Sequence, residues 1–402
     1  MTRPPARRSI LLVCPEIPAP PTWGFAVRVH HLAVHLGRRH RVSLIGYGRL
    51  RDQSDWVDLA GMVHRVRVVP PPSTLARRRW HQLASLVSPS SFHLTTLHSQ
   101  AMQQAIGELL AEDHVDLVQV ESSALMCFDF GSVPLVLDEH NIEYDLLRQV
   151  AGVERSLLRR GFGAVDSLKA RREERRAWER AQGCVATSPE DEAVIRAAHP
   201  SACTAVVPNG VDTDAFRPTA EPADPERLLF VGKMNYRPNA DAVVWFARHV
   251  LPRVRRSRPS TLFEVVGSDV PASLRGLPGV TWTGWVGDVR PSLEHAGVVV
   301  APLRAGGGTR LKILEGLAMA KPVVSTSLGA TGIDAVPGRH LIVADDPDGM
   351  ADQILRLMSD AGLRARLGAE GRALVLRRYG WAAAARRLDD FHGQITMRAG
   401  CP

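Results

Sequence analysis

A run of three glycines, at positions 306–308, stands inside the segment APLRAGGGTRLKILEGLAMAKPVVST (residues 301–326). The apolar residues before it predict a strand that ends near Leu303, and the residues after it predict a helix over 309–320. Thr309 is a suitable N-cap for that helix. A glycine loop that leads into a helix N-terminus presents backbone N–H groups and the positive end of the helix dipole, so this segment suits an anion.

Two cations, Arg310 and Lys312, lie in the first turn of the expected helix. Positive charge at a helix N-terminus opposes the dipole, which favours a bound anion as the reason for both residues. Glu315 lies one turn after Lys312 on the same helix face, where its carboxylate can accept hydrogen bonds from a ribose diol. The alternatives are a tight turn with solvated basic residues and an ordinary surface ion pair.

A second anion-binding element is predicted in LLFVGKMNYRPNADAVVWF (residues 228–246). A strand, then Gly232 and Lys233, then a helix that begins near Pro238 would place Lys233 at the carboxyl end of the strand, where doubly wound sheets bind ligands. Only four of the fifty cations of the chain are lysines, and two of them fall in the two segments proposed to hold phosphate. This distribution supports the assignment.

These segments belong to an alternation of strand-like and helix-like runs that occurs twice along the 402 residues. Such alternation predicts parallel sheets covered by helices on both faces, and the length suits two domains. We therefore expect an α/β protein with two Rossmann-like doubly wound domains that face a central cleft. The expected domains are residues 1–216 and 217–379, and a last helical segment, 380–402, should pack back across the domain junction. The expected strands are residues 9–14, 41–47, 115–121, 133–139, 183–188, 227–234, 261–267, 279–285, 297–303 and 321–327.

Composition excludes several classes of protein. The chain is 45% hydrophobic and 23% charged, which excludes global disorder, and no apolar run is long enough to span a bilayer. The net charge of +8 is compatible with an acidic partner, but the arginines are scattered and no motif for nucleic acid is present, so we expect no nucleic-acid partner.

Five cysteines without a C-x-x-C pair, and a first apolar run too short for an export signal, favour a cytoplasmic protein. A dinucleotide site is excluded because the loop after the first strand, PEIPAPPTWGFAVR, holds a single glycine.

With these segments identified, the chain resembles retaining GT-B glycosyltransferases of the large group called family four, closest to sugar transferases of bacterial exopolysaccharide or related export systems. The second half carries the resemblance through VVPNGVDTDAFRP (206–218), LLFVGKMNYRPN (228–239), TGWVGDVRPSLEHAGVVVAPL (283–303) and GGGTRLKILEGLAMAKPVVST (306–326). The first half matches more loosely, through WGFAVRVHHLAVHL (23–36) and LDEHNIEYDLLR (137–148).

The resemblance implies a nucleotide-diphosphate sugar donor, bound mainly by the second domain, and no metal or other cofactor. Glu315 matches the ribose-binding glutamate of the family, and backbone around Val286 would meet the base. The diphosphate, as leaving group, would be stabilised by positive charge and by backbone N–H groups. We assign that role to Lys233, Arg310, Lys312 and the backbone N–H groups of Gly307 and Gly308, and we expect Gly232 and Thr309 to bind the donor beside them.

In the first domain, the resemblance matches Gly24 to a glycine loop near the acceptor and the donor phosphate, and His140 to a histidine near the reacting sugar. Phe25 and Arg28 follow that glycine and are expected on the acceptor side. His140 comes directly after an expected strand, and its neighbours Asp138 and Glu139 stay open as alternatives, as does a structural histidine.

Two departures from the family pattern concern the donor. Gly307 stands eight positions before Glu315, where the family commonly carries an acidic residue that helps hold the donor sugar. The second lysine usually found shortly after Lys233 is absent, with Pro238 near its place, and Arg310 and Lys312 could replace its charge.

The helical stretches contain further histidines and cations for which we expect no metal site. His31 and His35 lie one turn apart without an H-E-x-x-H pattern, and the D-T-D run at 212–214 predicts a turn. The basic segment TLARRRWHQLASLV (74–87) could rest on anionic lipid at the cytoplasmic membrane face, or be an ordinary surface helix. Residues 154–180 predict a solvated helix rich in ion pairs.

These residues predict transfer of a sugar from a nucleotide-diphosphate sugar to a glycan or lipid-linked acceptor, with retention and without metal. Two other functions stay open. Gly307 makes a catalytically silent nucleotide-sugar-binding partner plausible, and a nucleotide-sugar epimerase would use the same fold.

Overall fold

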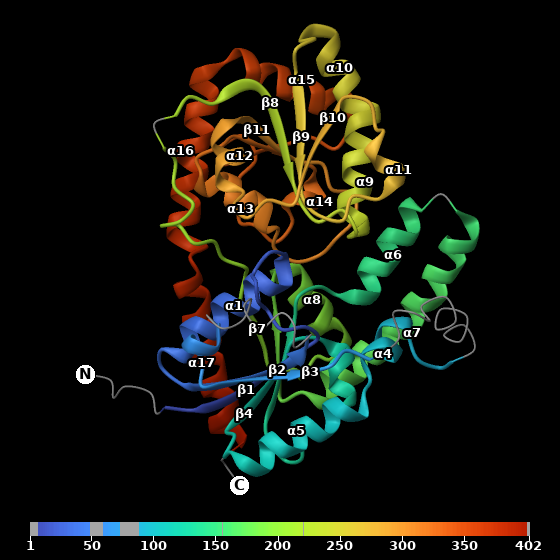
Figure 1. Cartoon of the computed structure of the whole chain (residues 1–402), viewed down its shortest axis with the longest axis vertical. Coiled ribbons are helices and arrows are strands. Elements are labelled where there is room, and N and C mark those ends of the chain that lie inside the picture. The colour runs from blue at the N-terminus through green and yellow to red at the C-terminus, as the bar shows by residue number, and fades with distance from the viewer. Residues whose placement is uncertain (1–6, 49–58, 73–87, 155, 220, 400–402) are drawn as a thin grey trace. The chain divides into compact units, whose positions relative to one another are not determined.

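The computed structural model describes residues 7–48, 59–72, 88–154, 156–219 and 221–399 and divides the chain into two compact units. The first unit runs to Pro208 and takes up the last segment from Trp381, and the second unit is Asn209–Gly380. The boundary thus precedes the Pro-rich stretch 217–226, part of which forms the start of a strand. Both units are α/β with a parallel sheet, which confirms the expected fold class (Figure 1).

The first unit is built on a seven-stranded parallel sheet with the order β3-β2-β1-β4-β5-β6-β7. Its strands are β1 Ser9–Cys14, β2 Arg41–Tyr47, β3 Arg65–Val69, β4 Leu117–Val120, β5 Leu135–Glu139, β6 Gly183–Ala186 and β7 Thr204–Val206. The five strands expected here are confirmed. The two edge strands β3 and β7 were missed because one alternates arginine with valine and the other has only three residues.

Helices cover both faces of this sheet. They are α1 Gly24–Gly37, α4 Phe92–Leu97, α5 Gln100–Glu112, α6 Glu143–Val153, α7 Leu157–Arg180, α8 Pro189–Ala198 and α17 Trp381–Ala399, with a 3₁₀ turn at Ser123–Cys127. The last helix, α17, packs against α1, and the Trp381 ring stacks on His31 with centroids 5.0 Å apart. His40 Nε2 also lies 2.7 Å from Asp389 Oδ1, so α17 is an integral part of the first unit.

The second unit has a six-stranded parallel sheet with the order β10-β9-β8-β11-β12-β13. Its strands are β8 Asp224–Val231, β9 Leu262–Val266, β10 Val280–Gly284, β11 Ala296–Ala301, β12 Val323–Ser325 and β13 Ile342–Val343. Its helices are α9 Arg237–Trp245, α10 Leu251–Ser257, α11 Ala272–Arg275, α12 Arg290–His295, α13 Leu311–Ala318, α14 Ser327–Ala330, α15 Pro347–Ser359 and α16 Ala361–Arg378, and a π-helical turn at Phe246–Val250 joins α9 to α10. The five strands expected in this half are confirmed.

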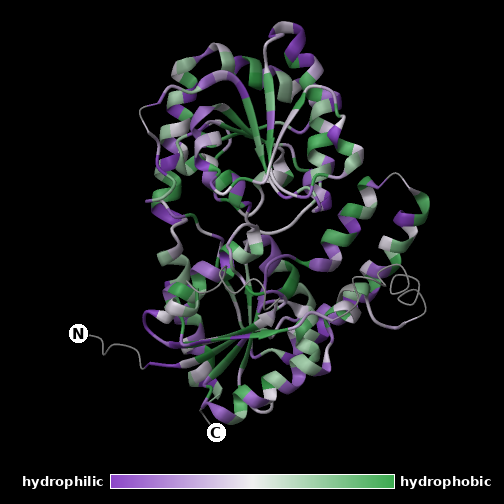
Figure 2. Cartoon of the chain, viewed as in Figure 1, coloured by the Kyte–Doolittle hydropathy of each residue, from purple (hydrophilic) through white to green (hydrophobic). Residues whose placement is uncertain are grey.

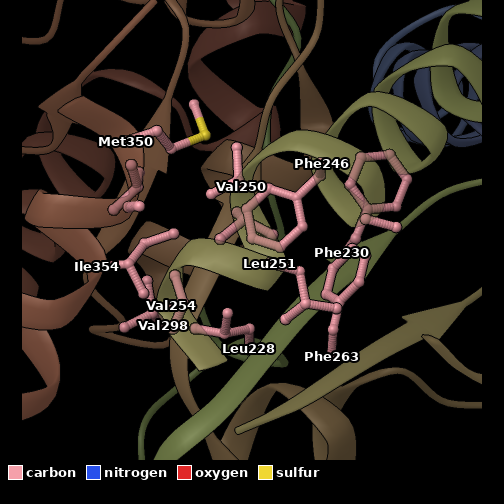
Figure 3. Close-up of a cluster of buried hydrophobic side chains, with 14 of the residues drawn as sticks. Leu228, Phe230, Phe246, Val250, Leu251, Val254, Phe263, Val298, Met350 and Ile354 are labelled. Carbon is pink, nitrogen blue, oxygen red and sulfur yellow. The ribbon is translucent and has the colours of Figure 1, made fainter. Parts of the chain in front are cut away.

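The apolar residues of both units gather on the strands and on the inner helix faces, whereas the outer helix faces are hydrophilic (Figure 2). In the second unit, Phe230 on β8 and Phe263 on β9 pack with Phe246, whose ring centroid lies 4.5 Å from that of Phe263 (Figure 3). Burial of such side chains contributes about 1.5–3 kcal/mol each. Among the described residues, no helix has the length and apolar character that crossing a bilayer requires.

Candidate functional site

The second unit brings two predicted segments to one edge of its sheet. Gly232 and Lys233 directly follow β8, and the loop 302–310 follows the neighbouring strand β11. From β8 the sheet continues to β9 and β10, whereas from β11 it continues to β12 and β13 in the opposite direction. Doubly wound sheets bind ligands at such a reversal, outside the carboxyl ends of the strands. Lys233 therefore stands where the sequence placed it.

Lys312 reaches from α13 to the end of β8. Its Nζ donates a hydrogen bond to Asn239 Oδ1 at 2.7 Å and lies 4.0 Å from the centroid of the Phe230 ring. A Cβ atom at Gly232 would come within 3.0 Å of Nζ and 2.7 Å of Asn239 Nδ2. A side chain at position 232 would therefore displace the ends of the Asn239 and Lys312 side chains. Lys312 supplies a cation beside the Gly232-Lys233 turn, where the second lysine of the family pattern is absent.

The charges of Lys312 and Glu315 are both disfavoured by burial. Burial, reinforced by the positive charge of Arg310, lowers the pKa of Lys312 to about 7. Burial raises the pKa of Glu315 to about 7, although the charge of Lys312 opposes that shift. A bound phosphate would favour the protonated form of Lys312, because an opposite charge stabilises the ammonium. The site is thus suited to take up an anion together with a proton.

The glycine loop is held from within by Arg310. Gly306 and Gly308 have φ values of 132° and 68°, which side-chain-bearing residues rarely adopt. The guanidinium of Arg310 turns back, and Nη1 donates to the carbonyl oxygens of Gly307 and, at 2.6 Å, of Gly308. Arg310 is 9% exposed. These bonds indicate that Arg310 holds the shape of the loop. The sequence predicts a different role, in which its charge stabilises the diphosphate.

The expected N-cap at Thr309 is wrong. The helix α13 begins at Leu311, with Arg310 at its N-cap position and no side-chain capping bond. Thr309 is buried, and its carbonyl oxygen accepts a hydrogen bond from Asn209 Nδ2 at 2.8 Å. The helix therefore begins two residues later than predicted, and Thr309 is held in the loop by Asn209 instead of capping the helix.

Two other predicted donor residues lie at the same sheet edge. Lys233 Nζ is 3.6 Å from Asp269 Oδ2 in the loop after β9, and both side chains are partly exposed. The backbone carbonyl of Lys233 accepts from Asn239 Nδ2 at 2.9 Å. Val286, after β10, packs partly buried against the core, next to Trp285, whose side chain is 64% exposed.

In the first unit, the predicted residues Gly24, Phe25 and His140 come together. Helix α1 begins at Gly24, and the Phe25 ring stacks between Trp23 and His140, with centroid distances of 5.2 Å and 5.0 Å. His140 directly follows β5, and its Nε2 lies 2.9 Å from Glu121 Oε2. An imidazole is thus placed at the carboxyl edge of the sheet, beside the N-terminus of α1.

Arg28 was expected on the acceptor side, but its side chain points into the protein interior. Its side chain is fully buried, and its guanidinium makes a bidentate ion pair with Asp138, with Nη2 2.9 Å from both carboxylate oxygens. Nη1 also donates to the carbonyl oxygen of Val207 at 2.8 Å. Helical periodicity turns this position of α1 toward the sheet, so we assign Arg28 a structural role.

The neighbouring carboxyl groups of β5 point to different partners. Asp138 binds Arg28, whereas Glu139 Oε1 accepts a hydrogen bond from Trp178 Nε1 at 2.8 Å. Burial raises the pKa of Glu139 to about 8, with the charges of nearby acids in support. Alternation along the strand places the two side chains on opposite faces.

Three residues that support the site were not singled out from the sequence: Asn209, Asn239 and Glu121. Asn209 and Asn239 lie within the quoted motifs. Asn209 stands directly before Gly210, a signal that could have drawn attention to it, whereas Asn239 only follows Pro238. Glu121 gave no such signal, because only the pairing of β4 with β5 brings it to His140.

The remaining expectations concern surface segments. Asp212 Oδ1 accepts from the backbone N–H groups of Asp214 and Ala215, which confirms a turn. Residues 157–180 form the expected helix α7, but the helix exposes leucines and buries Glu174, so it differs from the expected solvated helix. The segment 74–87, considered for lipid contact, lies outside the described residues.

Two family models match most of the chain. Residues 24–215 match the family described as Glycosyltransferase Family 4, and residues 225–360 match Glycosyl transferases group 1. The chain is 33% identical over 224 residues to the D-inositol 3-phosphate glycosyltransferase of Xylanimonas cellulosilytica, a match that covers 48% of this chain and 52% of that protein. It is 28% identical to the phosphatidyl-myo-inositol mannosyltransferase of Mycobacterium leprae, over 45% of this chain and 51% of the relative. The match thus spans about half the length of these curated relatives.

Solved structures show the same fold over nearly the whole chain. The sucrose-phosphate synthase of Thermosynechococcus elongatus superposes with a TM-score of 0.75 at 18% identity, covering 98% of this chain and all of that chain. The Anabaena protein HepE in complex with UDP-glucose gives a TM-score of 0.69 at 14% identity, covering 96% of this chain and all of that one. These similarities establish the GT-B architecture of the two units.

Proposed function

The chain is a GT-B glycosyltransferase of the group 1 and family 4 type, and from that premise we propose that it transfers a sugar from a nucleotide-diphosphate sugar to a glycan or lipid-linked acceptor. One observation carries the proposal. Lys312 lies at the end of β8 beside a glycine loop, and burial disfavours its positive charge. A bound diphosphate would favour that charge.

We propose that the leaving diphosphate is stabilised by Lys312, Lys233 and the backbone N–H groups of Gly307 and Gly308, without a metal. Fixed charges and dipoles directed at a developing negative charge are an effective form of catalysis. The bond between the anomeric carbon and the diphosphate oxygen breaks, and the bond to the acceptor oxygen forms. The acceptor proton passes to the departing diphosphate. Glu315 would bind the ribose diol, and Val286 would contact the base through its backbone.

For the sugar end of the reaction we propose His140, with Gly24 and Phe25 beside it. The proposal includes retention of the anomeric configuration, and it rests on the resemblance to family four. A role in exopolysaccharide or a related glycoconjugate pathway rests on the same resemblance. The names of the curated relatives add a phosphorylated inositol or an inositol lipid as acceptors to be tested.

The first test is a thermal-shift screen with UDP, GDP, ADP and their sugars. One base should raise the melting temperature above the others, because a ligand at a hundredfold its Kd stabilises the folded state by about 2.7 kcal/mol. No shift with any nucleotide would contradict the donor site. The variant Glu315→Gln should weaken the response to the nucleoside diphosphate more than the response to inorganic pyrophosphate, because only the nucleoside carries ribose.

The second test follows the sugar itself, with the donor that stabilises the protein and an acceptor panel in EDTA. Labelled sugar should move to an acceptor with retained anomeric configuration. Binding without turnover would favour the silent nucleotide-sugar-binding partner that Gly307 suggested. Altered stereochemistry in the nucleotide-sugar pool without transfer would favour the epimerase.

We also propose that the protein is cytoplasmic and contacts the cytoplasmic membrane face through the start of α7. Leu157 and Leu158 are 81% and 89% exposed, and the exposed residues Arg159 and Arg160 follow them. Exposed leucines next to cations suit an anionic lipid surface, where each cation contributes about 1 kcal/mol. We call these four residues the α7 tip.

If the α7 tip binds the membrane, the protein should float with vesicles that contain anionic lipid and not with vesicles of neutral lipid. The double variant Leu157→Ser/Leu158→Ser should lower the bound fraction several-fold. The matched control is Leu376→Ser, at a leucine of α16 that is 52% exposed and should not matter. Equal flotation of the α7 tip variant and the wild type would exclude this surface as the membrane contact.

A further inference from the structure

A buried chain of hydrogen bonds runs from the last helix to His140. His392 on α17 lies with Nε2 2.7 Å from Gln119 Oε1 on β4, and Gln119 Nε2 donates to Glu121 Oε1 at 2.6 Å. Glu121 Oε2 then lies 2.9 Å from His140 Nε2. Gln119 and His392 are fully buried and Glu121 is 2% exposed, so water does not replace these partners. The sequence motifs assigned no role to Glu121.

The donor and acceptor in each of these hydrogen bonds can be worked out from the bond between His392 and Gln119. Burial lowers the pKa of His392 to about 3, so its ring is neutral, and Nε2 donates to the amide oxygen of Gln119. The amide nitrogen of Gln119 therefore faces Glu121, whose Oε1 accepts. Burial raises the pKa of Glu121, and the hydrogen bond with His140 opposes that shift. With Glu121 ionised, its second oxygen can only accept, so the ring proton of His140 lies on Nε2.

A cation already occupies the other side of the cluster. Glu121, Asp138 and His140 present ligand atoms that lie within 4.8 Å of one another, as in a metal site. Both oxygens of Asp138, however, accept from the buried guanidinium of Arg28. The charge of Asp138 is thus balanced by Arg28, and Glu121 has His140 as its direct partner on this side.

We propose that Glu121 is the positioning residue for His140: it accepts from Nε2, fixes the ring in one tautomer, and so orients the ring for contact with the sugar or the acceptor. The contact with substrate rests on the proposed glycosyl transfer, whereas the tautomer does not. A carboxylate behind a histidine commonly sets which ring nitrogen carries the proton. The stack of the ring on Phe25 restricts its orientation further.

The test is the tautomer of His140, read from the nitrogen chemical shifts of ¹⁵N-histidine-labelled protein at pH 8. The His140 signals are identified by their loss in His140→Gln. The wild-type ring should be neutral and protonated at Nε2. In Glu121→Gln, the new amide oxygen must face the donor Gln119 Nε2, so the amide nitrogen faces His140 Nε2. The ring proton should therefore move to Nδ1.

The matched control is Glu139→Gln. This neighbouring buried acid bonds to Trp178 on the opposite face of β5, and the substitution should leave the His140 tautomer unchanged. With the donor and acceptor found above, kcat of Glu121→Gln should fall about 10–100-fold with little change in KM for the donor, the same range as when the carboxylate partner of a metal-bound histidine is removed. Glu139→Gln should keep the wild-type kcat.

The outcomes separate the two proposals. A wild-type ring that is protonated at Nδ1 or at both nitrogens overturns the role of Glu121, and this measurement does not depend on the folding of Glu121→Gln. An unchanged tautomer in folded Glu121→Gln overturns it as well. The expected tautomers in a protein that transfers no sugar would support the positioning role of Glu121 and contradict the proposed function.

Discussion

Lys312→Met should lower kcat for sugar transfer by about 10²–10³-fold, the loss typical for removal of one group that stabilises developing negative charge. Methionine keeps most of the length of the side chain next to Phe230 and removes only the ammonium. The effect should lie in kcat and in the affinity for nucleoside diphosphate, and much less in the affinity for the nucleoside alone. Steady-state kinetics of sugar transfer, and calorimetry with the nucleoside diphosphate and with the nucleoside, measure this difference.

The pH dependence gives a second signature of Lys312. Because its pKa is about 7 in the free protein, a diphosphate that binds at pH 7–8 should bring a proton with it. Affinity should therefore fall as the pH rises above about 7, and the heat of binding should differ between buffers of different ionisation enthalpy. In Lys312→Met both dependences should weaken.

Loss of the fold is not expected in this variant. A lysine whose folded-state pKa is lowered binds its proton more weakly in the folded chain than in the unfolded one. The stability of the wild type should thus rise as the pH increases above about 7, and Lys312→Met should remove that part of the dependence. For the kinetics, the control is Lys321→Met, at a partly buried lysine that donates to the carbonyl oxygen of Glu294, and this variant should keep the wild-type kcat. Wild-type kinetics of Lys312→Met would contradict the donor site.

Asp138→Asn should lower the free energy of unfolding of the first unit by about 3–5 kcal/mol, the cost of leaving a buried charge without its partner. Both side chains of the Arg28–Asp138 pair are fully buried, and the pair joins α1 to β5. Urea denaturation followed by the fluorescence of the tryptophans measures the change.

Two further variants show whether Arg28 acts through this pair. Arg28→Met combined with Asp138→Leu removes both charges and should recover much of the loss, because well-packed apolar pairs often replace buried ion pairs without cost. Arg67→Met breaks an exposed pair with Glu108 and should cost less than about 1 kcal/mol. An Asp138→Asn protein of wild-type stability with weaker acceptor binding would restore Arg28 to the acceptor side.

Local patterns in the sequence predicted much of the fold. The apolar runs 9–14 and 41–47 coincide with β1 and β2, and the helix-like run 26–39 overlaps α1. Each of these signals depends on residues close together in the chain. The edge strands were missed for the same reason, since a short or half-charged segment gives a weak local signal and becomes a strand through its neighbour.

Local sequence patterns were enough to predict the α/β architecture with two sheets, the glycine loop after β11, and Lys233 at the carboxyl end of β8. The partners of the charged side chains became known only from the folded protein. It turned Arg310 back onto the loop, brought Lys312 to β8, and buried Arg28 against Asp138. The physical reason is that periodicity shows which face of an element is buried, whereas a side chain's partner comes from elements distant in the chain. Glu121 depends on this most, because the pairing of β4 with β5 alone places it beside His140.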